Sequence, residues 1–228
     1  MKVKPMIFNP DMALALHEDR KGQTRRPVDI PDGWELKSAD LCKITGKHPK
    51  SGKWGVLIRR ETFDEIYEHD LIAAPAMPGD LIYVRETFRL FDSYDECDHA
   101  DFPCPCPGNG APIYFASCRD SESNWKPSIH MPRWASRTTL KVTRVRVERI
   151  QDISEDDAIA EGFKYTGWRP TYSDPDSGGE YSTASDKFAD TWISIYGDHW
   201  DSNGWCWVID FEVIHQNVDS YLKNLEAA

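Results

Sequence analysis

The sequence lacks any long apolar run. None of its apolar stretches comes near the roughly 18 residues that a membrane-spanning helix needs, and the short apolar run after Pro5 is too brief for the core of a signal peptide. We therefore expect a cytoplasmic protein with no membrane partner. With 228 residues and 40% hydrophobic content, the chain can bury the core of a single elaborated domain.

Positive charge is scarce as well. The 27 Lys and Arg residues are outnumbered by 38 Asp and Glu residues, so the formal net charge is −11. A protein that binds duplex nucleic acid by neutralising phosphates usually has a basic surface, so broad duplex binding is disfavoured. A small ligand, or a few nucleotides in a local basic pocket, remains compatible with this composition because nearby charges set the field in a pocket.

The six cysteines form no Cys-x-x-Cys pair, and no secretory signal accompanies them. Reduced thiols are therefore expected rather than a disulfide framework. Cys97, Cys104, Cys106 and Cys118 lie in one region with His99, which could suggest zinc, but their spacing is irregular for a zinc site. We predict that the protein folds and acts without zinc or any other cofactor.

A regular alternation of strands and helices is also absent, and short patterned segments are separated by turn-rich ones. Val3 to Phe8 predicts a strand. A helix should follow Pro10, with Asp11 as its N-cap, and end near Asp19. The segment Leu81 to Thr87 begins apolar on both faces, which predicts a central strand.

Two later segments predict long strands. From Thr138 to Ile150 the apolar residues change phase, from even positions before Thr143 to odd positions after it. Because a strand keeps a period of two, a β-bulge or sharp bend near Thr143 is expected, and such a corner favours a curved sheet. The last strand, Trp205 to His215, should turn an apolar face that includes Trp207 and Phe211 toward the core.

Two short helices are expected near the end of the chain. Ser154 is the predicted N-cap of a helix that stops at Gly162, and a second helix covers Asp186 to Tyr196 and ends at Gly197. Many strands with a few short helices indicate an α+β protein, a single mixed β-barrel with flanking helices. Three hydrophilic or turn-rich segments are interpreted as long loop insertions: 29–77, 92–111 and 164–183.

The most informative segment runs from Arg20 to Pro27, where three arginines and one lysine surround the hydroxyl of Thr24. One interpretation is a solvated run of like charge; the interpretation we favour is an anion or nucleotide site. A neutral lysine beside a threonine can take the hydroxyl proton, whereas a charged lysine can stabilise a developing oxyanion. The sequence alone leaves open whether Lys21 and Thr24 face each other, because a helix would align them and a strand would oppose them.

Lys21, Thr24 and Arg26 follow the predicted helix with the spacing Lys-x-x-Thr-x-Arg. This spacing resembles the early signature of the ASCH family, although Asp19 replaces the usual glycine. The resemblance implies a PUA-like barrel, and the segment 125–137 is similar to a phage or prophage branch, which would place the protein in a host cytoplasm. Scattered further blocks share the resemblance: 79–85, 160–162 and 209–211.

Some small bacterial ASCH proteins are amidohydrolases that remove acetyl from N4-acetylcytidine. The resemblance implies that Lys21, Thr24 and Glu161 would form the catalytic set. Thr24 would be the nucleophile, Lys21 its base, and Glu161 a proton carrier or an orienter of the leaving amine. A glutamate just before a helix-ending glycine is also common on solvated helices, so the role of Glu161 depends on how that short helix aligns.

Further polar residues are candidate ligand contacts. Arg133, Trp134, Ser136 and Arg137 lie close together between a proline-bounded loop and a strand, where they could stack a base and bind phosphate or carbonyl oxygens; simple packing is the alternative. His130 is more typical of a packed histidine than of a catalytic one. The other candidate ligand-binding residues are Arg26, Arg85 and Glu86, of which the last two are equally typical of a surface ion pair.

Two classes of function follow from these residues. One is an enzyme that hydrolyses the amide of an acylated nucleoside; the other is a non-catalytic module that binds RNA or a modified base. A ribonuclease, an activity credited to some ASCH relatives, is a third possibility. The partner in each case is a nucleoside or single-stranded RNA. Convergence of Lys21, Thr24 and Glu161 within hydrogen-bond reach of one pocket is the feature that discriminates between these functions.

Overall fold

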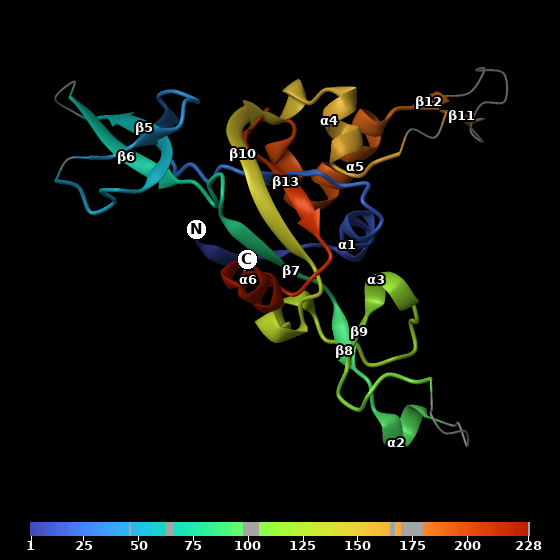
Figure 1. Ribbon diagram of the computed structural model, residues 1–228. Helices are drawn as coiled ribbons and strands as arrows, with labels where there is room; N and C mark the ends of the chain where they lie inside the picture. Colours follow the sequence, from blue (N-terminus) through green and yellow to red (C-terminus); the bar gives the residue numbers. More distant parts are fainter. Residues whose placement is uncertain (46, 63–65, 98–104, 165–166, 170–179, 228) are drawn as a thin grey trace.

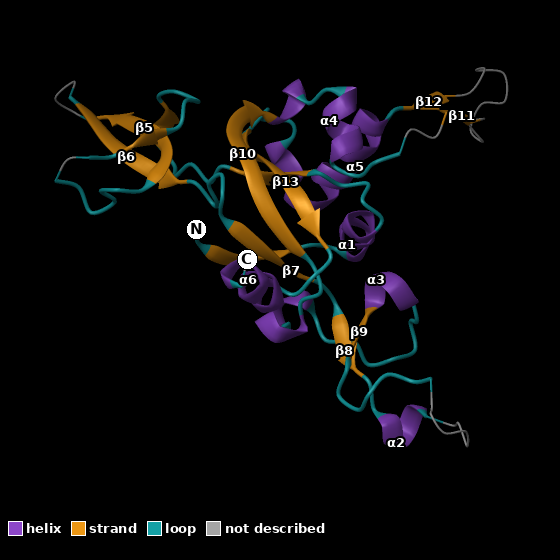
Figure 2. Ribbon diagram, in the orientation of Figure 1, coloured by secondary structure: helices purple, strands orange, loops and turns teal. Residues whose placement is uncertain are grey.

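The computed structural model of the protein describes residues 1–45, 47–62, 66–97, 105–164, 167–169 and 180–227. At its centre is a five-stranded sheet in the order β1-β7-β10-β13-β2 (Figure 1). Its strands are β1 (Val3–Ile7), β7 (Leu81–Arg85), β10 (Thr139–Arg149), β13 (Trp205–Ile214) and β2 (Gln23–Pro27). β1 runs parallel to β7, and the other neighbours are antiparallel. Helices are interspersed between the strands, so the class is mixed α+β, as predicted (Figure 2).

The strand predictions for β7 and β10 are confirmed. β7 is central, between β1 and β10, and Leu81, Ile82 and Val84 are all buried. In the pairing of β10 with β13, Val142 lies opposite Phe211 and the register shifts before Arg144. Thr143 is therefore the extra residue of a bulge, and β10 is visibly curved (Figure 1).

β13 is buried on both faces, which goes further than the sequence predicted. Trp207, Ile209 and Phe211 belong to the main core cluster, as expected from their alternation. Cys206 and Val208 point the other way and pack in a second cluster beneath the helices. β13 therefore links the two clusters. Each large apolar side chain that it buries stabilises the fold by about 1.5–3 kcal/mol.

The predicted barrel is not closed in the described residues, because the sheet stays open between its edge strands. In the described part of the chain β1 and β2 pair only with β7 and β13, not with each other. The Lys2 carbonyl accepts from Leu81 N, and Phe8 N donates to the Arg85 carbonyl, so the backbone groups of even-numbered residues point to β7. Those of odd-numbered residues in β1 point to the open edge, where Pro5 has no N–H to donate. One side chain crosses the gap: Arg26 Nη2 donates to the Ile7 carbonyl at 2.6 Å.

Three helices flank this open edge: α1 (Pro10–His17), α4 (Glu155–Ala160) and α5 (Ala184–Tyr196). The N-cap of α1 is Asn9 rather than Asp11, because Pro10 occupies the first turn and the Asn9 side chain accepts from Met12 N at 2.8 Å. Ser154 caps α4 as predicted. α5 begins earlier than predicted, with Thr183 as the N-cap of a capping box.

Two of the three segments interpreted as loop insertions, 29–77 and 164–183, contain strands. Segment 29–77 forms a second antiparallel sheet, and its residues Val56, Ala74 and Ala76 join the main core cluster, so it is not a loop. Its strands are β3 (Glu35–Leu36), β4 (Cys42–Lys43), β5 (Trp54–Glu61) and β6 (Tyr67–Ala73). The apolar run from Val56 to Ile58 in β5 is a strand signal that the turn-rich residues around it obscure.

The remaining elements are short. A hairpin, β8 (Phe88–Leu90) with β9 (Pro112–Tyr114), precedes α3 (Phe115–Cys118), and α2 (Ser93–Glu96) lies within 92–111. Much of segment 164–183 lies outside the described residues. Within its described part, β11 (Gly167–Arg169) pairs with β12 (Glu180–Ser182). Helix α6 (Val218–Glu226) closes the chain. No helix in the described residues is long and apolar enough to cross a membrane.

Candidate functional site

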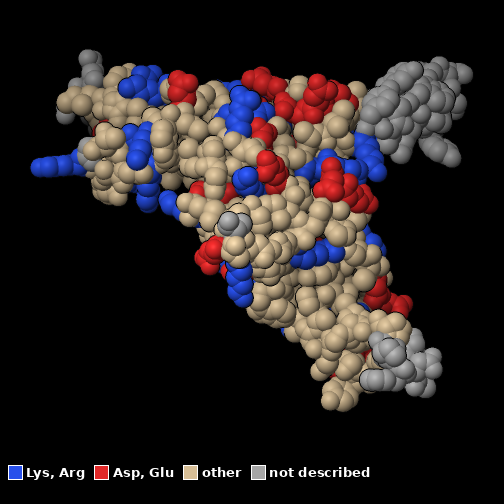
Figure 3. Space-filling view, in the orientation of Figure 1, with Lys and Arg blue, Asp and Glu red and all other residues tan. Residues whose placement is uncertain are grey.

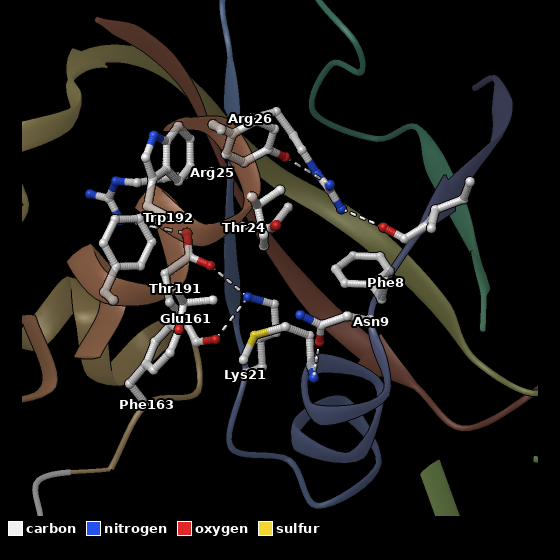
Figure 4. Close-up of a pocket in the computed structure, with 15 residues that line it drawn as sticks. Phe8, Asn9, Lys21, Thr24, Arg25, Arg26, Glu161, Phe163, Thr191 and Trp192 are labelled. Carbon is white, nitrogen blue, oxygen red and sulfur yellow. Dashed lines mark hydrogen bonds and ion pairs between the residues drawn. The ribbon is translucent and has the colours of Figure 1, made fainter. Parts of the chain in front are cut away.

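A cavity of about 290 Å³ lies at the open edge of the main sheet. The end of β1, helix α1, strand β2, the end of α4 and one face of α5 contribute its walls (Figure 4). Its apolar surface is largely aromatic, and the aromatic residues are Phe8, Phe163, Phe188, Trp192 and Tyr196. An aromatic-walled cavity of this kind suits a planar ring.

Lys21 enters this cavity from the turn between α1 and β2. It is only 2% exposed, and its Nζ donates to Glu161 Oε2 at 2.5 Å and to the Glu161 carbonyl at 2.8 Å. The backbone reinforces the contact, because Gly22 N donates to the Ala160 carbonyl at 2.9 Å. Residues 140 positions apart in sequence are thus joined at the end of α4.

Gly162 permits this close approach. Its φ of +100° lies in the region that side chains other than glycine's rarely adopt, and it ends α4 as predicted. A Cβ on Gly162 would lie 2.9 Å from the Ala15 Cβ and 3.3 Å from the Lys21 Cβ. The glycine therefore lets α1 and the Lys21 stem pack directly against the end of α4.

Thr24 stands on β2, where it pairs with Ile209 of β13. It is 4% exposed, and its side chain lies on the cavity side of β2 in the same space as the Lys21 amine (Figure 4). The structure thus brings together the three residues expected to form a catalytic set: Lys21, Thr24 and Glu161. Glu161 is 3% exposed, so it is not on a solvated helix face.

Burial governs the charge of the Lys21 amine. Desolvation lowers the pKa of Lys21 below its usual 10.5, and the nearby charges of Arg26 and Arg25 lower it further. The Glu161 carboxylate opposes this change through its charge and its hydrogen bond, without reversing it. A lysine held in this way gives up its proton more readily than one in water.

Arg25 is a site residue that was missed from the sequence. Its side chain is fully buried behind the cavity wall, with Nη2 at 3.2 Å from both Glu148 Oε2 and Asp157 Oδ2. Its Nη1 lies 3.7 Å from Glu161 Oε1, too far for a hydrogen bond. Within the described chain, that Oε1 is buried without a hydrogen-bond partner, so Glu161 keeps one acceptor open. An arginine among several in a basic run gives no sequence signal of burial.

Asp157 anchors this arginine. Burial alone would raise its pKa, but hydrogen bonds from Gln23 and Ser154, with the charges of Arg25 and Arg146, lower the pKa of Asp157 to about 2. Gln23 Nε2 bridges Asp157 Oδ1 at 3.0 Å and Asp210 Oδ1 at 2.8 Å. A buried polar network of this kind fixes Arg25, and with it the surroundings of Glu161.

Arg26, a predicted ligand contact, does line the cavity. Its guanidinium lies 5.2 Å from the Phe8 ring centroid, and besides the Ile7 carbonyl it reaches the Tyr196 hydroxyl at 3.4 Å. It therefore spans the cavity edge from β1 to α5. Asn9 and Trp192, which also line the cavity, were not singled out from the sequence because capping and core packing explain such residues equally well.

The other predicted ligand contacts lie elsewhere, and none of them lines this cavity. Ser136 is buried and its hydroxyl donates to the Val84 carbonyl at 2.8 Å. Arg137 and Glu86 pair with each other, with Nε to Oε1 at 2.9 Å. The three that remain are Arg85, whose guanidinium bonds the Ile129 carbonyl, Arg133, which pairs with Asp219, and Trp134, which is exposed. A single pocket that combines these residues with Lys21 is therefore not formed.

The cysteine region shows no grouped metal ligands among the residues that the structure describes. Cys104 and His99, two members of the predicted cluster, lie outside those residues. Burial raises the pKa of the Cys206 thiol, in the second core cluster, to about 12. Burial therefore disfavours the thiolate form of Cys206.

No family model, curated protein or solved structure matches this chain. The chemistry of the cavity must therefore be judged from its own residues. They offer an aromatic wall for a planar ring, a hydroxyl, an amine with a lowered pKa, a carboxylate with one open oxygen, and a guanidinium at the edge. This set suits hydrogen bonding to a nucleobase and acyl transfer to a hydroxyl.

Proposed function

We propose that the protein is an amidohydrolase that removes the acyl group from an acylated nucleoside such as N4-acetylcytidine. The observation that carries this proposal is the meeting of Lys21, Thr24 and Glu161 in one cavity, with Lys21 Nζ at 2.5 Å from Glu161 Oε2. These are the residues that resemblance to the ASCH family implies. Membership of that family, with its PUA-like fold, is part of the same proposal.

The size and lining of the cavity support a nucleoside-sized ligand. Its volume of about 290 Å³ is close to the lower limit of about 300 Å³ for small-molecule sites. The rings of Phe8 and Trp192 line the cavity, and an aromatic lining is favourable for a planar pyrimidine. The open oxygen of Glu161 can accept a hydrogen bond from the amide N–H on the base.

In the first half of the reaction the Thr24 hydroxyl attacks the acetyl carbonyl carbon. Neutral Lys21 takes the hydroxyl proton, and its lowered pKa increases the neutral fraction. The tetrahedral intermediate collapses, the C–N bond breaks, and the amine leaves with a proton returned by Lys21 through Glu161. The acetyl group remains as an ester on Thr24.

In the second half a water molecule hydrolyses this ester. Glu161 or Lys21 takes the water proton as the new C–O bond forms, and Thr24 recovers its own proton when the ester bond breaks. Acetic acid leaves and releases its proton to the solvent as acetate, and the three side chains return to their starting states. Arg26, at the cavity edge, is placed to stabilise negative charge on the ligand.

One observation favours a non-catalytic binding function as the second candidate. Lys21 donates to two oxygens of Glu161 in the free protein, and a charged amine held in this way is a hydrogen-bond donor rather than a base. Such a site would bind RNA or a modified base without turnover.

The test is incubation of the purified protein with N4-acetylcytidine and measurement of released cytidine. Thr24→Val removes the hydroxyl at constant shape and should abolish turnover, whereas Thr24→Ser keeps the hydroxyl and should retain it. Lys21→Ala should abolish turnover as well. Mass spectrometry of the reacting wild type should detect an acetyl group on Thr24.

The outcomes separate the two candidates. Full activity of Thr24→Val on acylated nucleosides would exclude Thr24 as the nucleophile. Wild-type protein that binds RNA but turns over no acylated nucleoside would replace the enzyme with the binding function.

A further inference from the structure

Asn9 holds its side-chain amide in one orientation at the wall of the cavity. It is the N-cap of α1, and its side chain accepts a hydrogen bond from Met12 N at 2.8 Å. A backbone N–H can only donate, so the acceptor must be Oδ1, and the NH2 group forms the other branch of the amide. Pro10 favours the extended backbone of Asn9, with φ −70° and ψ 165°, that this cap requires.

The NH2 group of Asn9 faces the cavity. In Figure 4 the Asn9 amide extends between Phe8 and Lys21, toward the part of the cavity where Thr24 lies. Asn9 is half-buried, and within the described residues its Nδ2 has no hydrogen-bond partner. Its two N–H donors are therefore open to a ligand.

A second asparagine N-cap in this protein shows what such an amide binds. Asn217 caps α6 through its Oδ1, which accepts from a backbone N–H at 2.9 Å. Its Nδ2 lies 2.9, 3.2 and 2.8 Å from the carbonyl oxygens of Arg133, Trp134 and Ser136. Since the amide of a capping asparagine serves carbonyl oxygens there, the same group on Asn9 suits a carbonyl oxygen supplied by the ligand.

The charged donors of the cavity are already engaged. Lys21 donates twice to Glu161, and Arg26 donates from its two terminal nitrogens to the Ile7 carbonyl and the Tyr196 hydroxyl. Exposed Lys and Arg side chains gather over the second sheet, which lies across the main sheet from α1 and α5 in this view (Figure 3). A neutral amide beside the nucleophile is thus the donor best placed to meet new negative charge.

We propose that Asn9 is a catalytic residue of the acyl transfer, whose Nδ2 donates to the acyl carbonyl oxygen of the substrate. This inference rests on the proposed function. As the Thr24 oxygen bonds to the carbonyl carbon and Lys21 takes the hydroxyl proton, one electron pair of the C=O double bond moves onto its oxygen. Asn9 stabilises this oxyanion by a hydrogen bond and transfers no proton. The pair returns to the C=O bond as the C–N bond breaks, and the same contact serves hydrolysis of the Thr24 ester.

The experiment measures kcat and KM for release of cytidine from N4-acetylcytidine. Serine caps a helix about as well as asparagine but is too short to reach the ligand, so Asn9→Ser removes the donor and keeps the cap. Its kcat should fall about 10²- to 10³-fold with little change in KM, because an oxyanion donor acts in the transition state. Asn9→Asp, which also caps, places a negative charge beside the oxyanion and should lose at least as much.

Thermal unfolding separates the donor from the cap. Asn9→Ala lacks both, so its unfolding midpoint should fall by about 2–4 °C, whereas Asn9→Ser should unfold close to wild type. The two variants should nevertheless lose the same kcat. Asn217→Ser is the matched control, because it loses the three carbonyl contacts of that Nδ2 far from the cavity. Its midpoint should fall while its kcat stays at the wild-type value.

The outcomes are distinct. Wild-type kcat in Asn9→Ser would overturn the proposal, and so would a raised KM with unchanged kcat, since the amide would then bind an oxygen of the ground state. Loss of kcat in Asn9→Ala but not in Asn9→Ser would assign the effect to the cap. Wild-type protein without turnover would refute the proposed function and this inference with it, whereas an active wild type with a fully active Asn9→Ser refutes the inference alone.

Discussion

Replacing Glu161 by glutamine tests how the buried pair with Lys21 contributes to stability. The two side chains are 4% and 1% exposed and their Nζ–Oε2 distance is 2.5 Å. Glu161→Gln keeps the shape and removes the negative charge. Loss of one partner of a buried ion pair typically costs about 3–5 kcal/mol, because the other charge is left uncompensated in the interior.

Lys21 can limit this cost by releasing its proton on folding. From an unfolded pKa of about 10.4, deprotonation costs about 4.6 kcal/mol at pH 7 and about 1.9 kcal/mol at pH 9. The folded variant then binds fewer protons than the unfolded chain, so its stability must rise with pH. We expect the free energy of unfolding of Glu161→Gln to increase by up to about 2.7 kcal/mol between pH 7 and pH 9.

The assay is urea denaturation at both pH values and constant ionic strength. The control is the double variant Lys21→Met/Glu161→Gln, which lacks the amine but keeps every other titrating group, including the thiols. The difference between the two variants in how the free energy of unfolding changes with pH gives the contribution of the Lys21 amine. An equal pH dependence in the two variants would show that Lys21 keeps its proton when Glu161 loses its charge, and would refute the account of its neutralisation.

The other two predictions concern the support of the site. Asp157, whose folded pKa is about 2, should contribute stability above its unfolded pKa of about 3.9 that is lost as pH falls toward 2. Wild type should therefore lose about 1–2 kcal/mol more than Asp157→Asn over that window in acid denaturation, and equal losses would contradict the low pKa. Gly162→Ala should destabilise by more than the roughly 1–3 kcal/mol of backbone strain alone, since its Cβ would meet the Ala15 Cβ at 2.9 Å. The matched control is Gly33→Ala, with a positive φ and open space around it, which should show only the strain; equal thermal shifts in the two would argue against tight packing at Gly162.

The sequence determined those features that arise from local patterns. Period-two alternation located β13 and its buried Trp207 and Phe211, and the phase change in β10 located the bulge at Thr143, because side chains must alternate along a strand. Capping chemistry likewise located the start and end of α4, with Ser154 and Gly162 at its ends. Each of these signals is complete within a few residues.

Only the tertiary structure decided what depends on contacts between distant segments. That Arg25 is buried follows from partners far along the chain, such as Glu148, and that segment 29–77 packs onto the main core follows from contacts outside its own sheet. The open edge between β1 and β2 also depends on how distant strands assemble. Lys21 and Thr24 were recognisable from their spacing, but their meeting with Glu161 required the end of α4 to pack against the start of β2. Two short sequence motifs cannot specify that contact, because the energy that fixes it comes from the core they share.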